Sequence, residues 1–113
     1  MAQDSRTEAV NPYAGEVQLM LDGQPYRARL TLGALAGLEA DLGADSMIAL
    51  IERFEGGAFS TRDMLAVLVA GLRGGGWQGS LDDLLTVEIG GGPLQAARSA
   101  AELIARAFRV DAS

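Results

Sequence analysis

The chain contains no cysteine and no histidine. This removes thiolate and imidazole as nucleophiles, general bases and transition-metal ligands, and so excludes much common enzyme chemistry. No disulfide can form, and residues 1–15 contain no apolar run of the length that a signal peptide needs. We therefore expect a cytoplasmic, non-catalytic protein that needs no metal and no cofactor.

Lysine is also absent, and all nine basic residues are arginines. They are spread from Arg6 to Arg109, while the net charge is −6 and the sequence pI is near 4.4. A phosphate backbone repels such a chain, so we expect no nucleic-acid partner. The longest apolar stretch, residues 64–72, has about half the roughly 20 residues of a membrane-spanning helix, so we expect no membrane partner.

The residues that are present indicate a folded domain. Of the 113 residues, 49% are hydrophobic and 21% are charged, unlike a disordered chain, and this length fits one core. Residues 1–12 are polar, lack periodicity and end in Asn11-Pro12, so we predict a flexible N-terminal arm there. Residues 13–110 are predicted to form a single compact α+β domain.

A β-hairpin is predicted over residues 16–31, where apolar and other side chains alternate. Asp22-Gly23 lies between the two runs and is typical of a tight hairpin turn. The apolar faces are Val17, Leu19 and Leu21 on the first strand and Tyr26, Ala28 and Leu30 on the second. An isolated hairpin is marginal in water, so we expect the helical remainder of the chain to cover this face.

Two short helices are expected next. Thr31 is the predicted cap of the first, which ends at Gly43, and Asp45 or Ser46 caps the second, which ends at Gly56-Gly57. Their apolar positions are Leu32, Leu35, Leu38 and Leu42 in the first helix and Met47, Ile48, Leu50, Ile51 and Phe54 in the second.

Two further helices have capping-box spacing at their starts, Ser60-Thr61-Arg62-Asp63 and Ser80-Leu81-Asp82-Asp83. Residues 64–72, which follow the first box, are apolar nearly all round, so this helix should be the most buried. Gly74-Gly75-Gly76 and Gly90-Gly91-Gly92 are predicted helix breaks. Neither leads into the Gly-Lys-Ser/Thr of a phosphate loop, and Asp82 with Asp83 diverge on a helix, so neither feature predicts a catalytic or phosphate site.

The last predicted helix, over residues 94–109, is amphipathic. Its apolar stripe is Leu94, Ala97, Ala101, Ile104 and Phe108, and Leu103 widens that surface. The stripe could pack on the chain's own hairpin or enter a partner's groove, and both alternatives stay open. Leu103 and Phe108 are therefore candidate partner-binding residues. Trp77, between glycines, is a third candidate, although we favour an anchor in the chain's own core.

Several segments together resemble one family. They are Asn11-Pro12 with Gly15-Glu16-Val17, Leu21-Asp22-Gly23 with Tyr26, Leu30-Thr31-Leu32-Gly33-Ala34-Leu35-Ala36-Gly37-Leu38-Glu39, and Gly71-Leu72-Arg73-Gly74-Gly75-Gly76. On these residues, the chain resembles the small tail protein of gene transfer agents and long-tailed phages that is encoded between the tail tube and the tape measure. The resemblance spans residues 11–109. One departure is Gly37, where such proteins carry a longer helix former.

Members of this family are described both as tail tube proteins and as tail-assembly chaperones. A tube ring needs many strands that close into an inner β-barrel, whereas this sequence predicts one hairpin and several helices. The resemblance therefore implies an acidic tail-assembly chaperone that binds the tape measure protein, with the tail tube protein as a second partner. The alternative is a structural tail component retained in the particle. The oligomeric state stays open.

Overall fold

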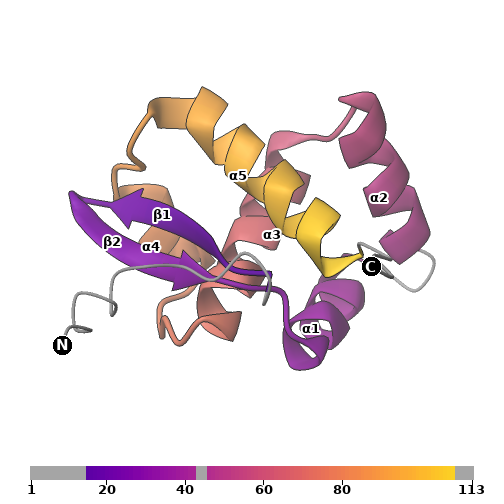
Figure 1. The fold of residues 1–113 in the computed structure, drawn as a ribbon, viewed down its shortest axis with the longest axis horizontal. Helices are drawn as coiled ribbons and strands as arrows, with labels where there is room; N and C mark the ends of the chain where they lie inside the picture. Colours follow the sequence, from indigo (N-terminus) through magenta and orange to yellow (C-terminus); the bar gives the residue numbers. More distant parts are fainter. Residues whose placement is uncertain (1–14, 43–45, 109–113) are drawn as a thin grey trace, which may run out of the picture.

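The computed structural model describes residues 15–42 and 46–108. In chain order it contains strands β1 (Val17–Leu21) and β2 (Gln24–Ala28), then helices α1 (Leu32–Leu42), α2 (Ser46–Gly56), α3 (Thr61–Gly74), α4 (Leu81–Thr86) and α5 (Gly92–Ala107). The hairpin lies to one side of α3 and α2 lies to the other (Figure 1). The predicted α+β architecture, a hairpin followed by helices, is confirmed. The predicted arm over residues 1–12, the helix end at Gly43 and the cap at Asp45 lie outside the described residues.

The hairpin has the predicted turn and the predicted faces. β1 and β2 pair antiparallel, with Leu19 opposite Tyr26. Asp22 and Gly23 have φ angles of 51° and 80°, the left-handed values that a two-residue type I′ turn requires. The apolar side chains of β1 are buried, as the alternation predicts.

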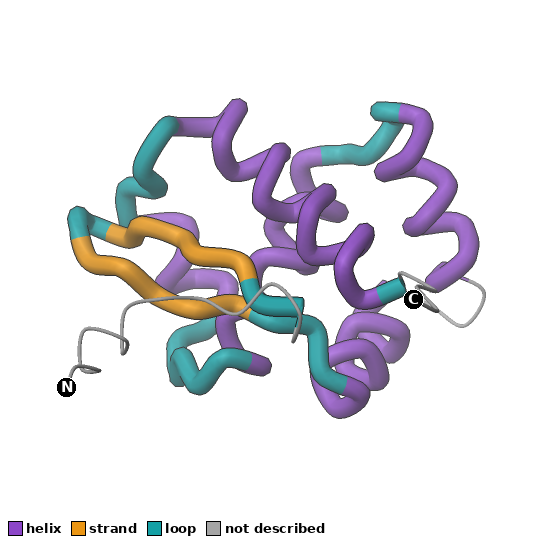
Figure 2. The backbone as a smooth tube through the Cα atoms, viewed as in Figure 1, coloured by secondary structure: helices purple, strands orange, loops and turns teal. Residues whose placement is uncertain are grey.

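The loop between α4 and α5 adds a short antiparallel pairing to β1 that the sequence analysis did not predict (Figure 2). Leu21 forms a bridge with Ile89, and the N–H of Gly90 donates to the carbonyl of Met20 at 2.9 Å. The Asp22 carboxylate accepts the N–H of Glu88 at 2.9 Å, so the hairpin turn and this loop hold each other in place.

Helix α3 is the centre of the fold, as predicted. It contacts α1, α4, α5 and β2, and its Val67, Leu68 and Leu72 side chains are fully buried. The buried residues of the hairpin and of the other helices pack around it in a single cluster. The apolar run over residues 64–72 therefore supplies the middle of the core.

The C-terminal end of α3 packs directly on the chain that leaves the hairpin. The N–H of Arg29 donates to the carbonyl of Gly71 at 2.8 Å. A Cβ atom at Gly74 would lie 2.0 Å from the carbonyl oxygen of Arg29, and one at Gly75 would lie 2.0 Å from that of Arg27. The predicted helix-breaking glycines thus have a second role, because they let two backbones touch.

Three predicted N-caps are confirmed. The Thr31 hydroxyl accepts the N–H of Ala34 at 3.0 Å. In α3, the Ser60 hydroxyl accepts the N–H of Asp63 while the Asp63 carboxylate accepts the N–H of Ser60, both at 3.0 Å. The same reciprocal pair of bonds joins Ser80 and Asp83 at the start of α4. Local side-chain chemistry therefore sets where these helices begin.

The buried face of α5 differs from the predicted stripe. It consists of Ala96, Ser99, Ala100, Leu103 and Ile104, and the helix begins at Gly92. Leu94, predicted to be part of the apolar stripe, is 64% exposed. The correction follows from close packing on α3, where a Cβ atom at Gly71 would lie 2.7 Å from Cδ1 of Leu103. Leu32 in α1 and Ile48 in α2, also predicted apolar positions, are exposed as well.

Candidate functional site

An open groove of about 910 Å³ runs along α1 and α3 and reaches α4. Its floor consists of small and apolar residues, and α4 adds Leu81 and Leu85 at its margin. The lining residues of α1 and α3 that carry no charge are Gly33, Ala34, Gly37, Leu38, Leu65, Ala66, Val69, Ala70 and Gly74. This surface is the main candidate site of the described chain.

The groove is open because small residues of α1 and of α3 line it. Gly33 and Gly37 lie one helical turn apart on α1, and Ala66, Ala70 and Gly74 follow at the same spacing on α3. Residues four positions apart share one face of a helix, so each helix presents a shallow stripe. A Cβ atom at Gly37 would meet no atom within 4 Å. Space that longer side chains would fill is therefore left open.

Apolar surface is exposed along this groove. Leu81 is 45% exposed and Leu85 is 59% exposed, although α4 is only one and a half turns long. On α3, Leu65 and Val69 are half-buried even though they belong to the central helix of the core. A contiguous exposed apolar surface of this kind is typical of a binding site for another protein.

Charged side chains also line the groove. Arg62 and Arg73 lie near the two ends of α3, and Asp41 lies on the α1 side. Both arginines are exposed, and neither forms an ion pair within residues 15–42 and 46–108. The α3 wall of the groove thus contributes two exposed arginines, within a chain whose net charge is −6.

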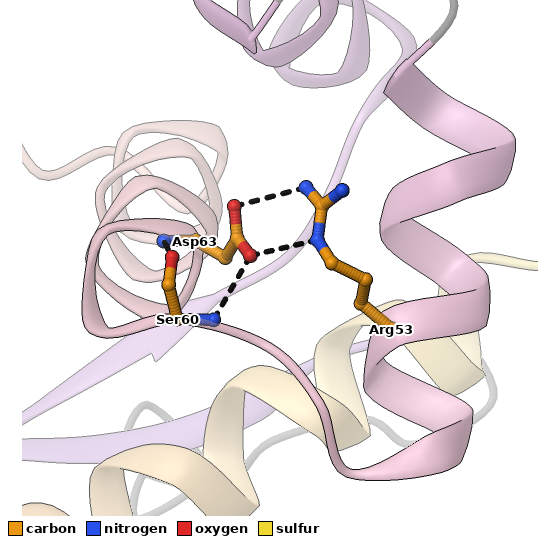
Figure 3. A network of polar contacts seen from close by, with 3 residues as sticks. All are labelled: Arg53, Ser60 and Asp63. Atoms are coloured by element: carbon orange, nitrogen blue, oxygen red, sulfur yellow. Dashed lines mark hydrogen bonds and ion pairs between the residues drawn. The ribbon is translucent and has the colours of Figure 1, made fainter.

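The start of α3 is held in place by an ion pair from α2 (Figure 3). The Arg53 guanidinium donates two hydrogen bonds to the Asp63 carboxylate, at 2.8 and 3.0 Å, and Asp63 also accepts the N–H of Ser60. Burial alone would raise the pKa of Asp63, but the Arg53 and Ser60 hydrogen bonds and the Arg53 charge outweigh it and lower that pKa below its ordinary value. This network fixes the helical turn that carries Arg62.

The structure places the three sequence-predicted binding residues elsewhere. Leu103 is fully buried and packs against Gly71 of α3, so it offers no free surface in the described chain. Phe108 is 37% exposed at the end of α5. Neither of them, nor Trp77, lines the groove.

Trp77 lies against the core, in line with the alternative that the sequence favoured. Its side chain is half-buried and packs on the hydrophobic cluster. The backbone N–H of Trp77 donates to the carbonyl of Leu72 at 2.9 Å. Gly79 gives the indole its space, because a Cβ atom there would lie 2.2 Å from the ring. Trp77 therefore anchors the loop that follows α3.

The sequence did contain a signal for the groove. Small residues at four-residue intervals occur in two successive apolar helices, and Gly37 lies in the middle of a helix where glycine is unfavourable by about 1 kcal/mol relative to alanine. These features indicate helix faces with little side-chain volume. The sequence of either helix alone does not show that the two faces lie side by side, so the groove itself could not be predicted.

Comparison with known families gives one match: the family described as phage tail tube protein, GTA-gp10, matches residues 14–110. Comparisons with curated proteins and with solved structures give no match. Within the described residues, no group of three or more Asp, Glu, His or Cys side chains could hold a metal ion. In the same part of the chain, every helix is too short or too polar to cross a bilayer.

Proposed function

Because the chain belongs to the phage tail tube protein, GTA-gp10, family and is thus a phage tail component, we propose that it is a non-catalytic tail-assembly chaperone. Its partner in this proposal is the tape measure protein, which it binds during tail assembly, with the tail tube protein as a second partner.

The observation that carries this proposal is the groove between α1, α3 and α4. In this proposal the partner is a long helical, aggregation-prone protein that the chain shields until tube subunits surround it. An apolar groove that charged side chains also line suits such a partner, because an amphipathic helix buries its apolar side in the floor and keeps its polar side in water. Covering that apolar side prevents aggregation of the partner.

The strand content also supports a chaperone over a tube subunit. Residues 15–42 and 46–108 contain one two-stranded sheet and the single Leu21–Ile89 bridge. A ring of tube subunits that closes into an inner β-barrel needs several strands from each copy. The acidic net charge of −6 favours a soluble complex, since like charges keep chaperone–partner complexes apart.

Co-expression with the tape measure protein tests the proposal. The expected result is that the tape measure stays in the soluble fraction and co-purifies with this chain, whereas the tape measure expressed alone aggregates. If the chain neither solubilises nor retains the tape measure, the chaperone function is wrong.

The second candidate function is a structural tail component that stays in the particle, and the description of the family as a tail tube protein favours it. Quantitative mass spectrometry of purified particles separates the two functions. If the chain is a chaperone, it should be absent from purified particles, or its amount should be far below one copy per ring of tube protein. A constant, stoichiometric amount in every particle would identify a structural component instead.

A further inference from the structure

We infer that the groove recognises a particular kind of helix: one whose apolar stripe is bordered on one side by two acidic side chains about three turns apart. One acidic side chain pairs with Arg62 and the other with Arg73. This inference rests on the proposed function, because it takes the occupant to be a helix of the tape measure protein.

The spacing follows from the position of the two arginines on α3. Arg62 and Arg73 are eleven residues apart in a continuous helix. At 1.5 Å and 100° per residue, this separation is about 16 Å along the axis and only about 20° around it. Both arginines therefore lie on the same face of α3, the face that lines the groove. A partner helix that lies along α3 meets both of them with carboxylates eleven positions apart, which share a face for the same reason.

The charge of the two arginines favours acidic partners on the α3 side. Arg62 and Arg73 have no ion-pair partner in the part of the chain that the structure describes, unlike Arg53, which Asp63 holds. Beside an apolar floor, a carboxylate that pairs with either arginine is less screened than in open water. The net charge of −6 repels an acidic helix at long range, but salt screens that repulsion beyond about 8 Å at physiological ionic strength. The local pairs therefore decide recognition.

Asp41 gives the site an orientation. It lines the groove from α1, whereas the two arginines line it from α3. A helix with acidic residues on both sides of its apolar stripe would meet this carboxylate unfavourably. The groove therefore selects a helix with acidic residues on one side only and with neutral or basic residues on the other, which fixes its rotation about its own axis.

The small floor residues define the apolar stripe of the partner. Gly37 faces open space, and the alanines of α3 beside it leave room for side chains from outside. Large apolar side chains, such as leucine or phenylalanine, fill such space and gain most from leaving water. The recognised stripe is thus rich in large residues that are complementary to the small residues of the groove.

Peptide binding tests this inference. Overlapping synthetic peptides of about 25 residues that cover the tape measure are labelled and titrated with the full chain by fluorescence anisotropy. The variants are Arg62→Glu and Arg73→Glu, and the matched control is Arg98→Glu. Arg98 is exposed on α5, lies outside the groove and has no ion pair among the described residues. All three substitutions change the net charge equally.

The peptides that bind wild type are expected to carry two acidic residues eleven positions apart. Each groove variant should bind them about tenfold more weakly, because attraction becomes repulsion, while Arg98→Glu should stay within about twofold of wild type. A second peptide carries Arg in place of the acidic residue that pairs with the substituted arginine. It should bind that groove variant more tightly than the original peptide does. Arg62→Gln and Arg73→Gln remove the charge without reversing it, and each should weaken peptide binding about fivefold. These two variants replace the Glu variants if a charge reversal unfolds the chain.

Failure of this inference differs from failure of the proposed function. If wild type retains the whole tape measure but the groove variants behave like Arg98→Glu, the inference is overturned and the chaperone function stands. If wild type binds neither the tape measure nor its peptides, both are wrong. If the purified chain alone forms a dimer that Arg62→Glu and Arg73→Glu dissociate, a second copy occupies the groove and the inference is again overturned.

Discussion

The Arg53 guanidinium in α2 binds both carboxylate oxygens of Asp63 in the first turn of α3, with Nε 2.8 Å from Oδ2 and Nη2 3.0 Å from Oδ1. The same carboxylate closes the capping box with Ser60. The Asp63 side chain thus caps the start of α3 and also joins α3 to α2. Because α3 forms one wall of the groove, this pair also supports the candidate site.

Asp63→Asn should destabilise the fold, because it weakens the cap and leaves the Arg53 charge without its partner. We expect the free energy of unfolding to fall by about 1 to 3 kcal/mol. Asp83→Asn is the matched control, since Asp83 closes a similar box at an exposed position without an arginine. Its loss should be about 1 kcal/mol or less. Equal losses in urea titrations would contradict a stabilising role for the Arg53 contact.

The same carboxylate predicts how stability depends on pH. Its pKa is lower in the folded chain than the ordinary value of about 4, so the folded state favours the ionised form. This contribution is complete above the ordinary pKa and is lost as the pH falls through the folded pKa. The stability difference between wild type and Asp63→Asn should therefore be constant from pH 7 to 5 and shrink below pH about 4. A difference that grows on acidification would contradict the assigned direction.

Leu68 tests the position of α3 in the core. Its side chain is fully buried in the middle of that helix. Leu68→Ala removes buried methyl groups and leaves a cavity, so we expect a loss of about 2 to 5 kcal/mol in denaturant titration. A loss below about 0.5 kcal/mol would mean that α3 is peripheral.

Two glycine substitutions should have opposite effects on stability. Gly74→Ala places a Cβ atom 2.0 Å from the carbonyl oxygen of Arg29, so the helix end must move away, at a cost of about 1 to 3 kcal/mol. Gly37→Ala meets no atom and improves helix propensity, which should add about 0.5 to 1 kcal/mol. Thermal melts of both variants check this, and a stabilising Gly74→Ala would refute the close contact between α3 and the hairpin.

Features of the fold that depend on neighbouring residues could be predicted from the sequence. The turn at Asp22-Gly23 and the caps at Thr31, Ser60 and Ser80 follow from the chemistry of a few adjacent residues, and all four are confirmed. The alternation of β1 likewise predicts its buried face.

Features that depend on contacts between distant elements could not be predicted. The 3-4 spacing of α5 predicts a stripe that includes Leu94 and Phe108, but the buried face includes Ala96 and Ala100, and Leu103 packs closely on Gly71 of α3. Leu103, a candidate partner-binding residue, is therefore buried. The pairing of Ile89 with Leu21 and the groove between α1 and α3 are non-local for the same reason.

The most direct test of the account is to block the groove without harming the fold. Gly37→Trp projects a large side chain from α1 into the open space, whereas Ala36→Trp places the same side chain at an exposed position of α1 outside the groove. Circular dichroism should show both variants folded, with Gly37→Trp at least as stable as wild type, since tryptophan is a better helix former than glycine.

The decisive measurement is the amount of tape measure protein that co-purifies with each variant after co-expression, divided by the amount that co-purifies with wild type. Ala36→Trp should retain the tape measure like wild type, while Gly37→Trp should retain about a tenth or less, because its side chain fills the groove. Equal retention by the two folded variants would contradict the account, since the tape measure would then bind elsewhere on the chain.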